Sequence, residues 1–125
     1  MFEVEFYYDK NDVSDIMNLI DELKEKVESD KNARINYKKI LTYIKVLSIE
    51  GTRAGEPYVK KLEGNLWELR PLKNRIIFFY WKDNKFVLLH HFMKKTQKTP
   101  KRELDVAKSK LKDYKGRNDT HEKEN

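Results

Sequence analysis

Four strand-like segments follow one another closely in the second half of the chain, and this spacing constrains the fold more than any other feature. The segments are rich in aromatic and branched apolar residues and span residues 58–62, 66–71, 75–81 and 86–93. Asp83-Asn84 separates the last two and favours a tight hairpin. Because parallel neighbours need a crossover of a dozen residues or more, such short connections predict antiparallel pairing.

The first half of the chain changes its hydrophobic period. Residues 2–8 alternate apolar and polar side chains, which is typical of a half-buried strand. The segment Asp9–Asp12 breaks this pattern and offers a helix N-cap. Residues 13–27 and 37–47 carry apolar side chains three and four positions apart, which predicts two amphipathic helices joined by a short turn. Gly51 is placed to end the second helix.

A third helix is predicted after Thr99-Pro100, because threonine is a good N-cap and proline is favoured at the first helical position. Gly116 is expected to end this helix. The chain would then form one domain, residues 1–116, followed by a flexible polar tail, residues 117–125. The elements together predict an α+β domain. It has a mainly antiparallel sheet of four to five strands, with the N-terminal helical hairpin packed on one face and a C-terminal helix.

Charge is distributed unevenly along the chain. Residues 1–50 have a net charge of −3 and residues 51–125 a net charge of +9, within a total of +6. This asymmetry favours polyanion binding by the second half, although a lysine-rich solvated surface would give the same counts. The chain has no cysteine, which excludes disulfides and thiolate-bound metals. With neither a signal peptide nor a membrane span predicted, the expected location is the cytoplasm.

Several familiar catalytic patterns are missing from the sequence. There is no glycine-rich phosphate loop and no serine in a nucleophile elbow. His90 and His91 are adjacent, so they should point to opposite faces of a strand rather than share a metal ion. We therefore expect no metal and no cofactor. His90 is either a hydrogen-bonded core residue or a general acid or base, for which an unperturbed pKa near 6.5 is suitable.

Cations are concentrated on the predicted sheet. Arg70 and Arg75 should lie close together on the face that also carries Glu68, with Lys94 and Lys95 at the end of the last strand. An open sheet face with these groups near its rim would bind RNA phosphates and stabilise charge that develops at phosphorus. The alternatives are arginines paired with nearby carboxylates and a solvated strand end. The further residues that we expect to contact RNA are Lys60, Lys61, Lys73, Lys98, Lys101 and Arg102.

Aromatic side chains accompany these cations. Some could stack on unpaired bases, but most aromatic residues in strands belong to a core. We expect at least three of five such residues to be buried, the five being Phe78, Phe79, Tyr80, Trp81 and Phe86.

Three segments carry a resemblance to a known family. They are Lys61-Leu62-Glu63-Gly64-Asn65-Leu66-Trp67-Glu68-Leu69-Arg70, Arg75-Ile76-Ile77-Phe78-Phe79, and Leu88-Leu89-His90-His91-Phe92-Met93-Lys94-Lys95-Thr96-Gln97-Lys98-Thr99-Pro100. In this order and at this spacing they resemble the phage-derived, HigB-like branch of the RelE/HigB-type toxins. The resemblance covers about residues 58 to 112, and the closing helix also fits.

The resemblance implies a RelE-like fold and a metal-independent endoribonuclease that cleaves mRNA on the ribosome through the substrate 2′-hydroxyl. It implies phosphate binding and transition-state stabilisation by Arg70 and Arg75. It places Lys94 and Lys95 near the cleavage site and His90 at a position of less settled role. The implied partner is an antitoxin protein, commonly of the helix-turn-helix type, through which alone DNA would be bound. No membrane partner is implied.

The sequence also departs from the family. Some members have a catalytic tyrosine in or near the last helix, but Tyr114 lies at the helix end and matches it poorly. Others use a His-Asp-His set that is not found here. Two alternatives to the enzyme therefore stay open. One is a non-catalytic module that acts through protein contacts, and the weaker one is a DNA-binding repressor.

Overall fold

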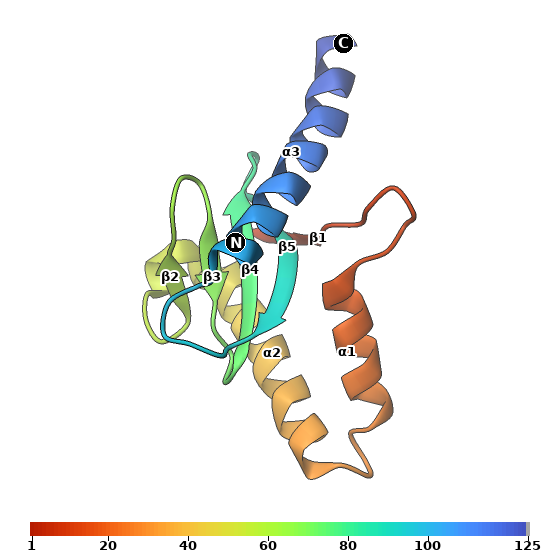
Figure 1. Cartoon of the computed structure of the whole chain (residues 1–125), viewed down its shortest axis with the longest axis vertical. Helices are drawn as coiled ribbons and strands as arrows, with labels where there is room; N and C mark the ends of the chain where they lie inside the picture. Colours follow the sequence, from red (N-terminus) through yellow and green to blue (C-terminus); the bar gives the residue numbers. More distant parts are fainter. Residues whose placement is uncertain (125) are drawn as a thin grey trace.

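The computed structural model describes residues 1–124, with side chains described for residues 1–118. Five strands form one sheet in the order β1-β5-β4-β3-β2, which confirms the predicted α+β class (Figure 1). The strands are β1 (Glu3–Phe6), β2 (Val59–Lys61), β3 (Trp67–Leu69), β4 (Asn74–Tyr80) and β5 (Lys85–Met93). The helices are α1 (Asp15–Glu25), α2 (Lys31–Glu50), the short 3-10 helix η1 (Gly51–Ala54) and α3 (Lys101–Glu124).

The strands from β2 to β5 pair antiparallel with their neighbours, as their short connections predict, and β1 adds a parallel edge beside β5. Asp83 and Asn84 both have positive φ, which is the geometry of a two-residue hairpin turn between β4 and β5. Within this pair Ile77 lies opposite His90 and Phe78 opposite Leu88, so Leu89 is an extra residue in β5. Such a bulge changes which side chains of β5 share a face.

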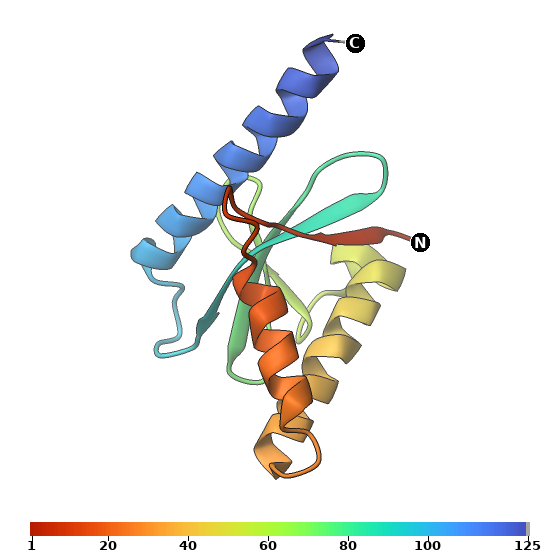
Figure 2. The same ribbon diagram turned by 90° about the vertical axis from the view of Figure 1, so that its right-hand side faces the viewer.

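The α1–α2 hairpin forms where the helical period predicts it, with different caps. Ser14 rather than Asp9–Asp12 caps α1, because its hydroxyl accepts the N–H of Met17 at 3.2 Å. Asp30 caps α2 in the same way at the N–H of Ala33. Gly51 ends α2 as predicted, with φ of 64°. In Figure 2 this hairpin extends from the sheet in the opposite direction to α3.

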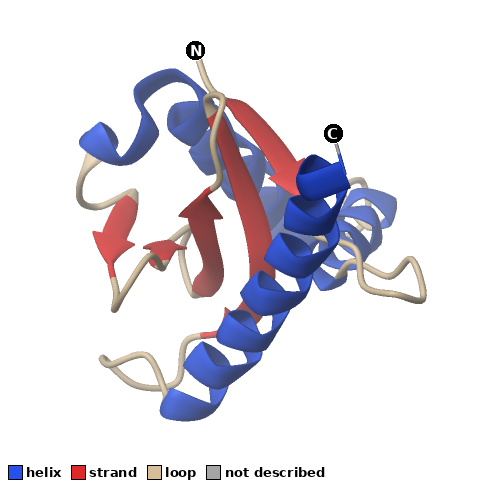
Figure 3. Cartoon of the chain, turned by 90° about the horizontal axis from the view of Figure 1, so that it is seen from above, coloured by secondary structure: helices blue, strands red, loops and turns tan. Residues whose placement is uncertain are grey.

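Two hydrophobic clusters hold the helices to opposite faces of the sheet. Apolar residues of α1 and α2, including Ile16 and Ile40, pack on the face that carries Leu69 and Phe78. Ala107 and Tyr114 of α3 pack on the other face, which also carries Ile77 and Phe79. Figure 3 shows the sheet between α3 and the hairpin. The second face is thus only partly open, and the prediction of an open cationic sheet face is wrong to that extent.

The third helix differs from its prediction at both ends. Among the described residues no backbone N–H donates to the Thr99 hydroxyl, which itself donates to Glu68. The Pro100 carbonyl instead accepts the N–H of Glu103 at 3.1 Å and that of Leu104 at 3.2 Å. The helix also continues through Gly116 to Glu124, so the predicted end at Gly116 is wrong. Glycine costs a helix only about 1 kcal/mol relative to alanine, and the ion pair between Asp113 and Arg117, four positions apart, spans this turn and helps to offset that cost. The domain limit at residue 116 and the flexibility of the tail stay predictions.

Candidate functional site

Two arginines share one buried carboxylate on the sheet face that α3 partly covers. Glu68 of β3 is only 3% exposed, and its Oε1 lies 3.5 Å from Arg70 Nε and 3.7 Å from Arg75 Nε. Thr99 completes the group by donating its hydroxyl to Oε2 of the same carboxylate at 2.8 Å. Arg70 and Arg75 are therefore close together, as the strand pattern predicts. We call Glu68, Arg70, Arg75 and Thr99 the arginine cluster.

Arg75 is held firmly within the arginine cluster. Its Nη1 donates to the carbonyls of Leu72 and Asn74, each at 2.8 Å, and the residue is 6% exposed. Leu72 adopts a φ of 59° in the turn before β4, which directs its carbonyl to the guanidinium. Burial and the charge of Arg70 lower the pKa of Arg75. The side chain is thus pre-organised, but little of it faces solvent.

Arg70 is the more accessible of the two arginines. Its side chain is 19% exposed and lies 4.0 Å from the exposed carboxylate of Glu56. Within the described residues, its Nε is a buried nitrogen without a hydrogen bond, although Glu68 Oε1 lies 3.5 Å away. The cluster therefore holds two positive charges against one buried negative charge, which suits it to receive an anion.

His90 lies in a second group, between two carboxylates from separate helices. Its Nδ1 is 3.1 Å from Asp15 Oδ2, at the start of α1, and its Nε2 is 2.8 Å from Glu103 Oε1, in the first turn of α3. Lys110 of α3 also donates to Asp15 Oδ2 at 3.1 Å. We call these four residues the histidine clip. The sequence analysis missed Asp15, Glu103 and Lys110, since they lie 75, 13 and 20 positions from His90.

The carboxylates of the histidine clip are stabilised in their charged form. Burial alone would raise the pKa of Asp15, but the hydrogen bond with His90, the charge of Lys110 and the N–H of His91 lower it overall. Burial alone would also raise the pKa of Glu103, but its contacts with His90 and Arg102 lower it overall. Both carboxylates are therefore ionised near neutral pH.

The arginine cluster and the histidine clip lie on the same sheet face. Ile77 of β4 pairs with Glu68 on one side and with His90 on the other. Since adjacent strands are about 4.8 Å apart, the backbones of Glu68 and His90 are separated by roughly 10 Å. Thr99 and Glu103, at the start of α3, lie over this gap and contact one group each.

The predicted RNA-binding cations do not form one continuous set. Lys60, Lys98 and Lys101 line adjoining grooves between the β2–β3 connection and the start of α3, with Thr99 and Leu104. The remaining positions are separate from these grooves. Lys61 lies over the Trp67 ring, and Arg102 forms an ion pair with Glu103. The backbone N–H of Lys94 donates to the Lys73 carbonyl beside the turn before β4. Lys95 is exposed in the loop after β5. The structure thus brings only some of the predicted contacts together.

The aromatic prediction is confirmed. Phe78, Phe79 and Phe86 are buried at 2% exposure or less, Tyr80 is 45% exposed and Trp81 is half-buried.

Among residues 1–118, whose side chains are described, no group of histidines and carboxylates could hold a metal ion. Within the described chain no helix is long and apolar enough to cross a bilayer.

Comparison with known proteins agrees with the sequence motifs. The family model "Phage derived protein Gp49-like (DUF891)" matches residues 20–112, while no curated protein matches the chain. Among solved structures, the chain is similar to one in the YoeB-YefM complex from Staphylococcus aureus, with a TM-score of 0.47 and 15% sequence identity. That match covers 76% of this chain and 99% of the other. Because the family model spans most of its length, the chain belongs to the phage-derived Gp49-like family.

Proposed function

We propose that the protein is the toxin of a toxin–antitoxin pair and cleaves mRNA on the ribosome. The observation that carries this proposal is the arginine cluster, in which Arg70 and Arg75 share the single carboxylate of Glu68. The grooves beside it are lined by Lys60, Lys98, Lys101 and Lys108. Lys101 pairs with Asp105 and Lys108 with Glu63, so it is Lys60 and Lys98 that favour the approach of a phosphate backbone.

The proposed chemistry needs no metal and no protein nucleophile. The substrate 2′-oxygen attacks the adjacent phosphorus, the bond from phosphorus to the 5′-oxygen breaks, and a cyclic phosphate and a 5′-hydroxyl result. The proton of the 2′-hydroxyl passes to a base, and an acid protonates the leaving oxygen. Arg70 and Arg75 would stabilise the negative charge that develops on the phosphoryl oxygens between these events.

The candidate groups for proton transfer are His90, Lys94 and Lys95. His90 is 12% exposed and both its ring nitrogens face carboxylates, so it would have to leave Asp15 or Glu103 to reach RNA. Lys94 and Lys95 are nearer to solvent, and RNA phosphate would attract them without such a rearrangement. We therefore assign His90 the role of holding Glu103 and the start of α3 against the sheet, and the two lysines the role of contacting RNA.

The proposed partner is an antitoxin that covers positive surface. Its contact segment should be acidic, because a basic segment would meet like charge on the lysine-lined grooves. A helix laid over these grooves would also cover Thr99, which donates a hydrogen bond to Glu68 of the arginine cluster. Binding of DNA would then occur through the antitoxin alone.

The test is growth after induced expression, combined with primer extension on a translated reporter mRNA. Wild-type protein should arrest growth and cut the message only when it is translated, and Arg75→Ala should lose both effects. Because Arg75 is bonded within the fold, exposed Lys95→Ala serves as the second variant, with activity expected to fall about tenfold for one lost phosphate contact. The matched control is exposed Arg53→Ala, which should arrest growth like wild type.

One observation favours the non-catalytic module instead. Arg75 is nearly buried and already has two carbonyl acceptors, in Leu72 and Asn74, and an ion pair with Glu68, as expected for a structural arginine. Growth arrest without cleavage, unchanged in Lys95→Ala, would support this module and contradict the enzyme. The same melting temperature in wild type and Lys95→Ala would establish that the comparison is between folded proteins.

A further inference from the structure

Another groove, separate from those lined by Lys60 and Lys98, lies at the end of the sheet opposite the turn at Leu72. It is lined by Lys61, Asn65, Trp67, Tyr80, Trp81 and Lys115, and we call it the aromatic groove. Three of these six side chains are aromatic, two are cationic and none is a carboxylate. The groove is formed by the ends of β2, β3 and β4 together with α3.

The rings of the aromatic groove are held in fixed positions. The Tyr80 hydroxyl accepts the N–H of Asn84 at 3.0 Å, and its ring meets Phe86 edge-on at 5.5 Å between centroids. The Trp81 ring packs edge-on against Tyr114 at 5.4 Å. These contacts leave Tyr80 45% exposed and Trp81 half-buried. Rings that are already ordered lose little conformational entropy when another ring stacks on them.

Positive charge lies directly over the indole rings. Lys61 Nζ is 5.0 Å from the centroid of Trp67, and Lys82 Nζ is 5.0 Å from that of Trp81. Lys115 of α3 adds a further cation to the lining. A surface that combines aromatic faces with lysines and lacks carboxylates is typical of sites for single-stranded nucleic acid.

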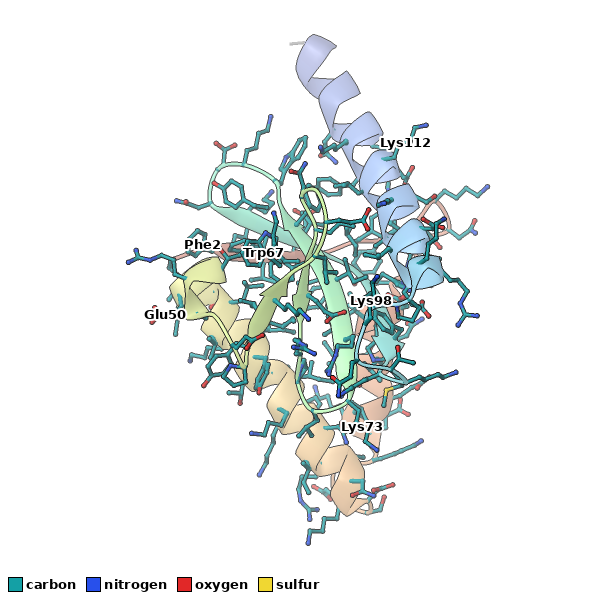
Figure 4. All side chains as sticks on the ribbon, turned by 60° about the vertical axis from the view of Figure 1, so that its left-hand side comes forward. Phe2, Glu50, Trp67, Lys73, Lys98 and Lys112 are labelled. Carbon is teal, nitrogen blue, oxygen red and sulfur yellow. The ribbon has the colours of Figure 1, made fainter. Side chains whose placement is uncertain are left out.

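The aromatic groove is separate from the arginine cluster. Tyr80 lies five positions after Arg75 along β4, a distance of about 17 Å at 3.3 Å per residue. In Figure 4, Trp67 lies in the upper half of the sheet, whereas Lys73, beside the turn before β4, lies at its lower end. A ligand in the aromatic groove would thus not touch Arg75 itself.

We propose that the aromatic groove binds unpaired nucleotides of the RNA, by base stacking on its rings and phosphate contact with Lys61 and Lys115. This inference rests on the proposed function, because it takes RNA as the ligand and adds a contact remote from the cleaved bond. A protein partner fits less well. Lysine is depleted at protein interfaces, and the lining has no aliphatic side chain to fill an apolar interface core.

The chain itself supplies the probe, because its two tryptophans, Trp67 and Trp81, both line the groove. A single-stranded 2′-O-methyl oligonucleotide cannot be cleaved through its 2′-oxygen, so binding is measured apart from catalysis. Titration into the full chain should quench the tryptophan fluorescence. Tyr80→Ala should weaken binding about fivefold or more, the lower end of what the loss of one stacked base costs.

Two matched variants separate stacking from other effects. Tyr80→Phe keeps the ring and loses only the hydroxyl, so its affinity should stay within about twofold of wild type. Tyr8→Ala removes a similarly exposed tyrosine, at 40% exposure, from the segment between β1 and α1 and should not change the affinity. Equal thermal unfolding of Tyr80→Ala and Tyr8→Ala keeps the comparison valid. If Tyr80→Ala is unstable, Lys115→Gln replaces it, with weaker binding expected again.

The outcomes distinguish this inference from the proposed function. Quenching that Tyr80→Ala weakens supports the groove even if no message is cleaved in cells. Cleavage in cells without quenching overturns the groove and leaves the proposed function standing. If Tyr80→Ala leaves RNA affinity unchanged but weakens binding of the antitoxin, the groove is a protein contact and the inference is wrong.

Discussion

The hydroxyl of Thr99 donates a hydrogen bond to Oε2 of Glu68 at 2.8 Å, although the residues lie 31 positions apart. This bond joins the segment that leads into α3 to the carboxylate that Arg70 and Arg75 share. The loop after β5, which contains Lys94 and Lys95, is thereby joined through Thr99 to the carboxylate that the two arginines share. Glu68 is the common partner on which the cluster depends.

Glu68→Gln should destabilise the fold, because two largely buried arginines lose their counter-charge. Breaking a buried ion pair costs about 3–5 kcal/mol, and since glutamine still accepts from Thr99, we expect a loss of about 2–3 kcal/mol in the free energy of unfolding. Urea denaturation measures it. Glu56→Gln, whose side chain is 72% exposed, is the control and should change stability by less than about 0.5 kcal/mol. Equal midpoints for the two variants would contradict the shared counter-charge.

Glu68→Gln should strengthen RNA binding even though it weakens the fold. Glu68 competes with phosphate for both arginines, so Glu68→Gln should bind a 2′-O-methyl oligonucleotide more tightly than wild type, by about threefold to tenfold at low salt. Fluorescence titration at two salt concentrations measures this. Unchanged or weaker binding by the folded variant would mean that the arginines do not contact phosphate.

The histidine clip should make stability depend on pH in the acid range. The pKa values of Asp15 and Glu103 are lowered in the folded protein, so their contribution is fully present above their unfolded values, about 4. It is lost as the pH falls from there through the folded values. In His90→Gln the loss between about pH 5 and pH 3 should be smaller, as followed by urea midpoints across this range.

The adjacent residue provides the control for this pH dependence. His91→Gln keeps the backbone N–H that donates to Asp15 at 3.2 Å, and its side chain contacts Asn74 instead. Because burial lowers the pKa of His91, His91→Gln should remove a loss of stability that begins as the pH falls below about 6.5, whereas the loss due to Asp15 and Glu103 should remain. The clip would not be the source of the dependence if His90→Gln and His91→Gln gave the same curve.

Tyr7→Phe should weaken the contact between α3 and the segment that directly follows β1. The Tyr7 hydroxyl donates to Asp113 Oδ2 at 2.6 Å, and burial with this partner raises the pKa of Tyr7 to about 12. A hydrogen bond to a charged group contributes about 1.5–3 kcal/mol, so we expect thermal unfolding of Tyr7→Phe several degrees below wild type. Tyr8→Phe, at an exposed neighbour, should unfold as wild type does, and a similar fall there would argue against the Asp113 bond.

Gly51→Ala should be more harmful than the same change at Gly64. Both glycines have positive φ, 64° and 58°, but Gly51 also has ψ of −153°, a region essentially restricted to glycine, so alanine should strain the backbone more at position 51. A Cβ at position 51 would also lie 2.7 Å from the Phe2 ring, whereas position 64 is open. The difference in free energy of unfolding therefore reports the backbone strain and the steric clash at position 51 together. Equal losses in the two variants would mean that neither the backbone strain nor the contact with Phe2 is costly at position 51.

The sequence by itself determined the element types, the hairpin at Asp83-Asn84 and the end of α2 at Gly51, because these depend on local periods and turn chemistry. Strand alternation also determined that Arg70 and Arg75 share a face with Glu68. Its motifs indicated the family to which the chain belongs. These features need only residues that are near one another in the chain.

Only the tertiary structure decided what covers that face and what each cation meets there. The bulge at Leu89 resets the register of β5, and packing then brings Asp15 and Glu103 to the two nitrogens of His90. Burial beneath the turn at Leu72 made Arg75 a largely internal residue. No local period encodes such contacts, because they arise when separate helices bury their apolar faces on one sheet and carry polar side chains with them.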